Sequence, residues 1–332
     1  MEAVYCIGNM SIHIIQVPDK PHEKIYGRED AEAFVKAHFR EQINMLQDMV
    51  HYGTNLVPRC FSSSNKEIQD TIICAGLLKH VVGMLDGITV LLRQGAVFPS
   101  ELLLRSLFEG RLAIQWMLAK DTRTRALQYH VWHQREQLTW TRVAIKGTDE
   151  SKILDNAFKS DMKGQFAPMW VEREKMAREQ EKKIMALLNC PDLKPVNDEF
   201  DQLRKGKKHD VNWYTAFNGP KSIKKMCDEL NLPGDYNIFY SSASGVAHAT
   251  TLLDMVTPKG DDIIFEQIRS LEGMHQIISY TVSQTITTYQ MLLGHYRFSE
   301  LEAFFRKYLR DWRKPYMNIT RVVNEGGDTT FI

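Results

Sequence analysis

The chain has 332 residues, of which 43% are hydrophobic and 25% charged, as in an ordinary soluble globular protein with ample capacity for a buried core. Its 42 Lys and Arg residues nearly balance its 41 Asp and Glu residues. The resulting net charge of +1 excludes a protein drawn to nucleic acid or membrane by its overall field, so any such contact must be local. The five cysteines are scattered, odd in number and form no CxxC pair, which indicates reduced thiols in a cytosolic protein.

The N-terminal segment, residues 1–27, alternates loosely between apolar and polar residues, and we expect a short strand or hairpin there. It lacks the basic start and the apolar run of a secretory signal. The longest apolar stretch, residues 71–92, is interrupted by Lys79, His80 and Asp86, which argues against a membrane span. We therefore expect a cytoplasmic protein that has no membrane partner.

Helical periodicity dominates from residue 28 onward, and no long strand pattern follows. Asp121 and Asp235 mark two helix starts, and Gly95 and Gly147 mark two helix ends. The expected helices lie at 28–52, 65–94, 99–119, 121–145, 150–162, 168–189, 220–231, 236–256, 261–296 and 299–312.

The segment at 165–220 differs from its surroundings, because its helix is charged on most faces and the stretches that follow resemble exposed loops. We interpret it as an arm or insertion that projects from a helical core of residues 28–164 and 221–314. Residues 315–332 lack the apolar content to fold alone and form a tail. The predicted fold class is therefore all-α: a multi-helix bundle with a projecting charged helical arm and at most a small terminal β-hairpin.

The expected apolar helix at 65–94 contains polar residues that need an explanation. Asp86 shares seven-residue spacing with Lys79 and Arg93, which predicts an exposed stripe. His80 lies on a face with two glycines, and it is either a hydrogen-bonded core histidine, the more frequent case, or a catalytic one. The common signatures of nucleotide, metal and acyl-transfer sites are absent, so we expect neither a cofactor nor a metal site.

The strongest candidate site is a polar set within two apolar helices. Arg105 and Glu109 lie four residues apart in LLLRSLFEGRLAIQWML, and Tyr240, Ser244 and His248 share a face in FYSSASGVAHATTLL. Buried charges must satisfy one another, so we predict that Arg105, Glu109 and His248 form one cluster. Replacing Glu109 by Ala would then strand a buried cation and destabilise the fold by about 3 kcal/mol or more. The alternative is a structural ion pair that only fixes the register of the helices.

In combination, these segments resemble an uncharacterised bacterial family of all-helical domains of unknown function. The resemblance rests on His80, the LLLRSLFEG segment, Arg125 within an Asp-x-x-x-Arg-x-x-x-Tyr stretch, and the late helix with Tyr240 and His248, and it covers residues 70–255. The family is in turn distantly similar to HEPN-like helical proteins, which are frequent in bacterial defence and toxin systems. The resemblance implies an all-helical fold and carries no established chemistry.

HEPN ribonucleases place an Arg and a His four to six residues apart on one helix. Chance alone would produce roughly two such spacings in a chain of this composition, so the four observed are weak evidence. Arg125 with His130 is the best placed, in the helix that follows Arg105. The four pairs are Arg125 and His130, Arg123 and His130, Arg204 and His209, and Arg269 and His275.

Two basic segments are candidate nucleic-acid contacts. Arg204, Lys207 and Lys208 lie in a glycine-containing loop, which either binds nucleic acid or is simply a solvated surface. In residues 304–314, basic residues alternate with aromatic ones, which either track a phosphate backbone and stack on bases or form the buried face of an amphipathic terminal helix. The buried face is the more common arrangement.

Our preferred hypothesis is a cytosolic, HEPN-like effector that cleaves RNA without a metal. RNA supplies its own nucleophile, so the enzyme needs only an acid or base and a cation for the phosphate. His248 would move the proton, Arg105 or Arg125 would neutralise the phosphate, and Glu109 and Ser244 would orient them.

Two other functions fit the same residues. The first is a non-catalytic interaction module, whose polar network fixes the bundle while the arm and the C-terminal tail bind a protein partner or a second copy. The second is a hydrolase of a small phosphorylated ligand. A solvent-exposed His248 near Arg105 favours catalysis, whereas full burial with saturated hydrogen bonds favours the module.

Overall fold

The fold is helical throughout its core, which confirms the predicted all-α class. The computed structural model describes residues 28–62, 68–152, 167–206, 211–251, 256–259, 262–265, 268–325 and 328–331. The strand or hairpin expected within residues 1–27, and most of the helix expected at 150–162, lie outside these ranges. The helices and helical turns are α1 (Arg28–His38), α2 (Arg40–Phe61), α3 (Ile68–Arg93), α4 (Val97–Leu118), α5 (Thr122–Val143), α7 (Ala167–Leu188), α8 (Lys194–Arg204), η1 (Trp213–Thr215), α9 (Ile223–Glu229), α10 (Pro233–Asp235), η2 (Tyr236–Ser241), α11 (Ser242–Ala247), α12 (Met274–Tyr296), η4 (Phe298–Glu300), α13 (Leu301–Lys307), η5 (Tyr308–Trp312) and α14 (Arg313–Met317).

The chain forms two compact units. Unit 1 comprises residues 1–66, 74–118 and 231–332, and unit 2 comprises residues 67–73 and 119–230. The sequence suggested that the arm begins at residue 165, with the preceding helix in the core. The structure instead groups that helix, α5, with α7 and α8 in unit 2. The physical reason is that α5 buries its apolar residues against α7 and α8, which periodicity within one helix cannot reveal.

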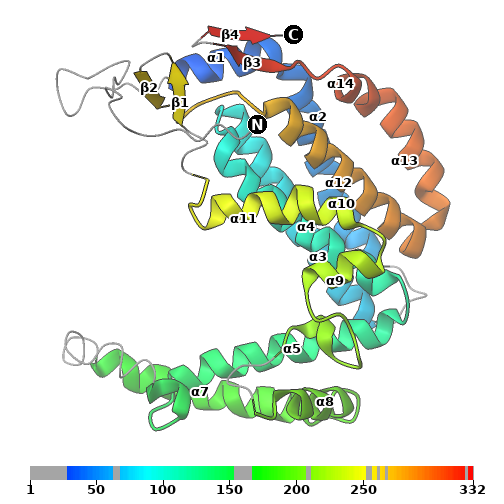
Figure 1. Ribbon diagram of the computed structural model, residues 1–332. Coiled ribbons are helices and arrows are strands. Elements are labelled where there is room, and N and C mark those ends of the chain that lie inside the picture. Colours follow the sequence, from blue (N-terminus) through cyan, green and yellow to red (C-terminus); the bar gives the residue numbers. More distant parts are fainter. Residues whose placement is uncertain are drawn as a thin grey trace. The chain divides into compact units, whose positions relative to one another are not determined.

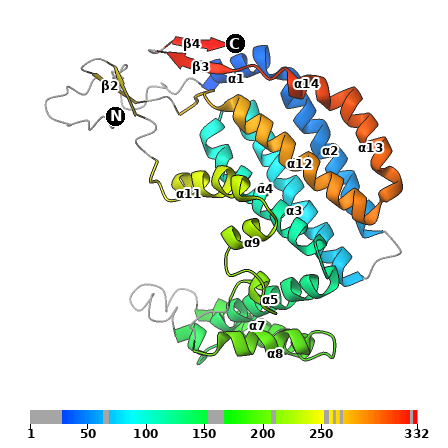
Figure 2. The ribbon, with the colours of Figure 1, turned by 45° about the vertical axis from the view of Figure 1, so that its right-hand side comes forward.

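In unit 1, α12 packs against both α2 and α4, and the three helices can be followed in Figures 1 and 2. A buried tyrosine joins α12 to α2: the Tyr289 hydroxyl donates a 2.8 Å hydrogen bond to the carbonyl of Met49. The hydroxyl lies over Gly53, where a Cβ would overlap it. Full burial raises the pKa of Tyr289 above its ordinary value, so the phenol stays protonated and keeps donating.

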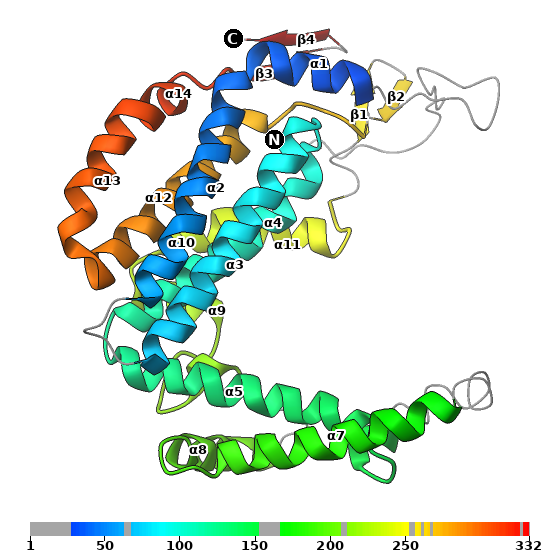
Figure 3. The ribbon, with the colours of Figure 1, turned by 180° about the vertical axis from the view of Figure 1, so that it is seen from behind.

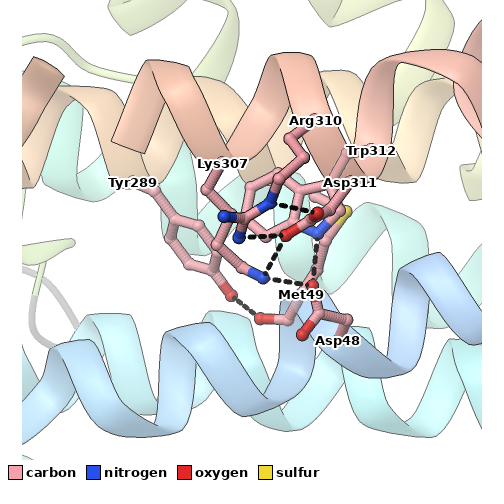
Figure 4. A network of polar contacts seen from close by, with 7 residues as sticks. All are labelled: Asp48, Met49, Tyr289, Lys307, Arg310, Asp311 and Trp312. Carbon is pink, nitrogen blue, oxygen red and sulfur yellow. Dashed lines mark hydrogen bonds and ion pairs between the residues drawn. The ribbon is translucent and has the colours of Figure 1, made fainter. Parts of the chain in front are cut away.

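The C-terminal helices α13, η5 and α14 are fastened to α2 by a network of polar contacts, drawn in Figure 4. The Asp48 carboxylate accepts 2.7 Å and 2.6 Å contacts from the Trp312 indole and the Lys307 ammonium. Lys307 also contacts Asp311 at 3.0 Å, and Arg310 holds the same carboxylate at 2.7 Å. The Trp312 ring itself is fully buried. The helical turn at η5 is therefore held against α2 both by a buried aromatic ring and by ion pairs at the surface.

This network makes a pH-dependent contribution to stability. Hydrogen bonds from Arg310 and Lys307 hold the pKa of Asp311 below its ordinary value of 3.8. A depressed folded-state pKa contributes stability above the unfolded pKa, and that stability is lost as the pH falls below it. We therefore expect Asp311→Asn to be less stable than wild type in urea at pH 7, and the difference to shrink at about pH 3. A deficit that stays constant over this pH range would contradict the assignment.

Unit 2 is built on α5, which runs beside α7 and α8, as Figure 3 shows from behind. Its core gathers Leu127 and Val131 of α5 with Ile184 and Leu188 of α7 and Phe200 of α8. Ion pairs border this core. Arg142 contacts Glu181 at 2.7 Å, and the buried Arg135 contacts Asp201 at 2.8 Å and donates to Asn197 at 2.7 Å.

Two short antiparallel hairpins lie where the sequence predicted helix or tail. Strands β1 (Val256–Lys259) and β2 (Asp262–Phe265) form the first, and α12 therefore begins at Met274 rather than near 261. The run of Ile263, Ile264 and Phe265 consists of residue types that favour a strand. Strands β3 (Val322–Glu325) and β4 (Asp328–Phe331) form the second hairpin, within the predicted tail.

Several local predictions about the surface and the apolar helices are confirmed. Lys79, Asp86 and Arg93 are all exposed, as the seven-residue spacing predicted. Phe304 and Trp312 of the C-terminal segment are buried, in agreement with an amphipathic terminal helix. One described helix, α3 from Asp70 to Arg93, is long and apolar enough to cross a bilayer, but half of its apolar window is buried in the protein, as in core helices of soluble proteins.

Candidate functional site

The candidate site lies in unit 1, where α4 carries Arg105 and Glu109. The Arg105 Nε donates a 3.0 Å hydrogen bond to the Glu109 carboxylate, at the i,i+4 spacing that the sequence indicated. The Arg105 side chain is 19% exposed and that of Glu109 is 41% exposed. The premise of a fully buried pair was therefore wrong, because Glu109 reaches solvent. Its removal should cost about 1 kcal/mol or less, not 3.

The second segment of the site begins with a π-helical turn, η2, and continues as α11. The Arg105 guanidinium lies 4.0 Å from the centre of the Tyr240 ring in a cation–π contact. Tyr236, one turn earlier, stacks on Tyr240 with ring centres 5.3 Å apart and planes inclined by 19°. The guanidinium is thus held by a carboxylate at its edge and an aromatic ring at its face.

The two segments run antiparallel along each other. Arg111 pairs with Asp235 at 2.6 Å, the rings of Phe108 and Phe239 stack, and Arg105 meets Tyr240. Descending numbers on α4 therefore match ascending numbers on η2 and α11. The part of the segment that follows, α11, also contacts α4.

His248 caps the C-terminal end of α11, not the middle of the expected helix at 236–256. The His248 N–H donates to the Ser244 carbonyl and the Thr250 N–H to the Gly245 carbonyl, while Ala249 has a positive φ of 53°. This is a Schellman ending with an alanine where glycine is usual, so the sequence carried no stop signal. The His248 side chain is exposed and has no hydrogen bond to a described residue.

The predicted cluster is therefore assembled only in part. Arg105, Glu109 and Tyr240 are in contact, and Ser244 and His248 follow Tyr240 at intervals of one turn. Eight residues of helix place His248 roughly 12 Å along the axis from Tyr240. The site is accordingly an elongated polar strip rather than a compact cluster.

Arg105 has donors to spare. Among the described residues its only hydrogen-bond partner is Glu109, which uses Nε and leaves the two terminal nitrogens for other acceptors. A guanidinium whose orientation is fixed in this way suits a planar anion such as a phosphate or a carboxylate, which it binds through two parallel hydrogen bonds.

His80 is satisfied by the neighbouring helix. Its Nε2 lies 3.1 Å from the Ser106 hydroxyl and 3.3 Å from the Ser106 carbonyl. The missing Cβ of Gly110 gives room for this approach, because a Cβ there would come within 3.0 Å of the His80 ring. His80 is therefore a hydrogen-bonded histidine between α3 and α4, the more frequent of the two alternatives, although its ring is exposed.

The remaining candidates lie in unit 2. Arg125 is buried in α5, where burial lowers its pKa while Glu229 and Asp121 act in the opposite direction. His130 is half-buried, and burial followed by the neighbouring His133 lowers its pKa. Arg204 is exposed at the end of α8, and Lys207 and Lys208 lie outside the described residues.

The sequence interpretation missed two residues of this strip. Arg111 is 4% exposed and pairs with Asp235, which was noted only as a helix start. The available signal was an arginine in the long apolar run after Glu109, which requires an acidic partner. Tyr236 could have been found from its i,i+4 spacing to Tyr240.

The described residues include no group of three or more His, Cys, Asp or Glu side chains placed to hold a metal ion.

Comparison with family models gives a match. A model described as a family of unknown function, DUF5677, matches residues 71–263, which includes α4, the Arg105 site and His248. No curated protein and no solved structure matches the chain.

Proposed function

The chain belongs to the DUF5677 family of unknown function, and from the geometry of its polar strip we propose that it cleaves single-stranded RNA by using the RNA's own 2′-hydroxyl as the nucleophile. The observation that supports this most is the Arg105 guanidinium, held on Tyr240 with its terminal nitrogens available, on the strip that ends at an exposed His248.

The length of the strip favours an extended ligand. Tyr240, which contacts Arg105, and His248 lie roughly 12 Å apart along the helix axis. A single phosphate ion cannot span this distance. A strand of RNA has a phosphate at every nucleotide, so Arg105 can bind one phosphate while His248 acts at another. Tyr236, which stacks on Tyr240, adds an aromatic ring of the kind on which bases stack. This argues against the small phosphorylated ligand considered from the sequence.

The chemical step assigns one role to each group. His248 removes the proton of a 2′-hydroxyl, whose oxygen attacks the adjacent phosphorus. The bond from phosphorus to the 5′-oxygen breaks, and that oxygen takes up a proton from water, which leaves a 2′,3′-cyclic phosphate and a 5′-hydroxyl. Arg105 binds and positions the strand through a neighbouring phosphate, Tyr240 and Glu109 hold Arg105, and Ser244 lies between the two ends.

The setting of the proposal comes from the sequence. The resemblance to HEPN-like proteins suggests an effector of a bacterial defence or toxin system. Cytosolic location fits an RNA substrate and scattered cysteines, and none of the four described cysteines forms a disulfide.

The test is a labelled single-stranded RNA incubated with purified protein in EDTA. Wild type should cleave it to a cyclic-phosphate end and spare the matching DNA, which lacks the 2′-hydroxyl. His248→Ala should lower the rate at least 100-fold with an unchanged melting temperature, because an acid or base catalyst contributes about 10²–10⁴. Arg105→Met should chiefly weaken binding, and Arg204→Ala should at most weaken binding and its salt dependence.

Two results would overturn the proposal: equal inertness of wild type and His248→Ala, or cleavage only after a metal is added. Either result would favour the non-catalytic module. That alternative is supported by the charged, largely exposed α7, which displays Met176 with 65% of its surface accessible. In that case the Arg105 site would serve as a structural contact between α4 and α11.

A further inference from the structure

The outer face of the C-terminal helical segment, Phe298 to Met317, exposes large apolar side chains. Phe298 is 75% exposed, Phe305 42%, Leu309 56% and Met317 67%. In Figures 1 and 2, α13 runs beside α12 at the edge of unit 1, and no described helix covers its other side. Side chains of this size are rarely displayed together without a partner.

These side chains form a stripe. Phe305, Leu309, Arg313 and Met317 follow one another in steps of four residues. In an α-helix such a step overshoots a full turn by roughly 40°, which would make the stripe spiral. In the π-helical turn at Tyr308–Trp312 the same step falls short of a full turn. The two angular offsets have opposite signs, so the side chains stay closer to one face than they would in a regular α-helix.

The stripe is also symmetric in chemistry. Phe298 and Met317 lie at equal distances on either side of a point between Lys307 and Tyr308, and the exposed Glu302 and Arg313 lie at equal distances from the same point. Phe305 and Leu309 flank it closely. The acidic Glu302 thus corresponds to the basic Arg313, and the apolar Phe298 at one end corresponds to the apolar Met317 at the other.

We propose that this stripe pairs with the same stripe of a second copy of the chain, in antiparallel orientation about a two-fold axis. Glu302 would then face the partner's Arg313 at both ends of the contact. Phe305 and Leu309 would pack against the partner's Leu309 and the partner's Phe305 in the middle. An isologous interface requires such self-complementarity. Glu302 is 79% exposed and contacts Arg306 at 3.3 Å within its own helix. It gives the stripe an acidic end, which matches the partner's Arg313 better than it matches a phosphate-bearing surface.

Charge exchange tests the pairing. A single helix pair is a small interface, so association is expected in the micromolar range, and sedimentation velocity should be measured up to about 100 µM. Glu302→Arg and Arg313→Glu should each weaken self-association at least tenfold, because each places like charges opposite one another at both ends. The double variant Glu302→Arg/Arg313→Glu exchanges the charges and should restore it to within about threefold of wild type.

Leu309→Glu should abolish the association, whereas Val90→Glu, at an equally exposed apolar position on α3, should leave it unchanged. Circular dichroism melting should show that the variants remain folded. A wild type that is monomeric at every concentration overturns the proposal, as does a double variant no better than the single ones. Loss of RNA binding in Arg313→Glu without a change in association would assign the stripe to nucleic acid instead.

Discussion

Replacement of Gly53 by Ala is expected to destabilise the protein by about 3 kcal/mol, the upper part of the usual range for an overpacked core position. A Cβ at this position would overlap the Tyr289 hydroxyl and would lie 2.6 Å from Val82 Cγ2 and 2.8 Å from Tyr289 Cζ. Neither neighbour can move easily, because Tyr289 is fully buried and Val82 is 7% exposed. Alanine's higher helix propensity offsets only about 1 kcal/mol of this cost.

Gly83→Ala is the matched control. Gly83 is also a helical glycine of unit 1, but nothing lies within 4 Å of a Cβ built there. The same substitution should therefore stabilise the protein by about 0.5–1 kcal/mol through helix propensity alone. Urea denaturation of both variants measures the contrast.

Tyr289→Phe provides the second control. It removes the hydroxyl that overlaps the new Cβ, at the expense of the hydrogen bond to Met49. The double variant Gly53→Ala/Tyr289→Phe should be more stable than the sum of the two single effects predicts, because the substitutions share one contact. Strict additivity, or a Gly53→Ala protein as stable as wild type, would show that α2 and α12 are not in close contact at this point.

The sequence revealed those features of the fold that depend on local chemistry. The start of α5 follows from Asp121, whose carboxylate accepts the Thr124 N–H at 3.1 Å, and α3 is followed by Gly95 with a φ of +66°. The spacing of Arg105 and Glu109 predicted their contact. Each of these signals is contained within one turn of helix.

Features that depend on contacts between elements were not recoverable. The helix at 236 stops at His248 because Ala249 adopts a left-handed conformation. An alanine in the sequence does not predict this conformation, which is usual for glycine. The assignment of α5 to unit 2 depends on which helix its Leu127 and Val131 face, and periodicity gives the face without the neighbour. The burial of Arg111 and the exposure of Glu109, two residues apart, likewise depend on where η2 and α11 cross α4.

Removal of Asp235 should be more costly than removal of Glu109, although both carboxylates pair with an arginine of α4. Arg111 is 4% exposed and Arg105 is 19% exposed, so the cation left behind by Asp235→Ala is the less accessible to water. Breaking a fully buried pair costs about 3–5 kcal/mol. Because Asp235 itself is 29% exposed, water can enter its place, and we expect about 2–3 kcal/mol.

Glu109→Ala should cost about 1 kcal/mol or less, since the carboxylate it removes is 41% exposed and Arg105 keeps its contact with the Tyr240 ring. Asp235→Asn, which retains an oxygen acceptor for Arg111 and loses only the charge, should fall between the two. Denaturant midpoints of the three variants at pH 7 give this order. If Glu109→Ala proved as damaging as Asp235→Ala, Arg105 would be as dependent on its carboxylate as Arg111 is. The guanidinium would then be fully engaged within the fold, and it would have no donors for the RNA phosphate that we assign to it.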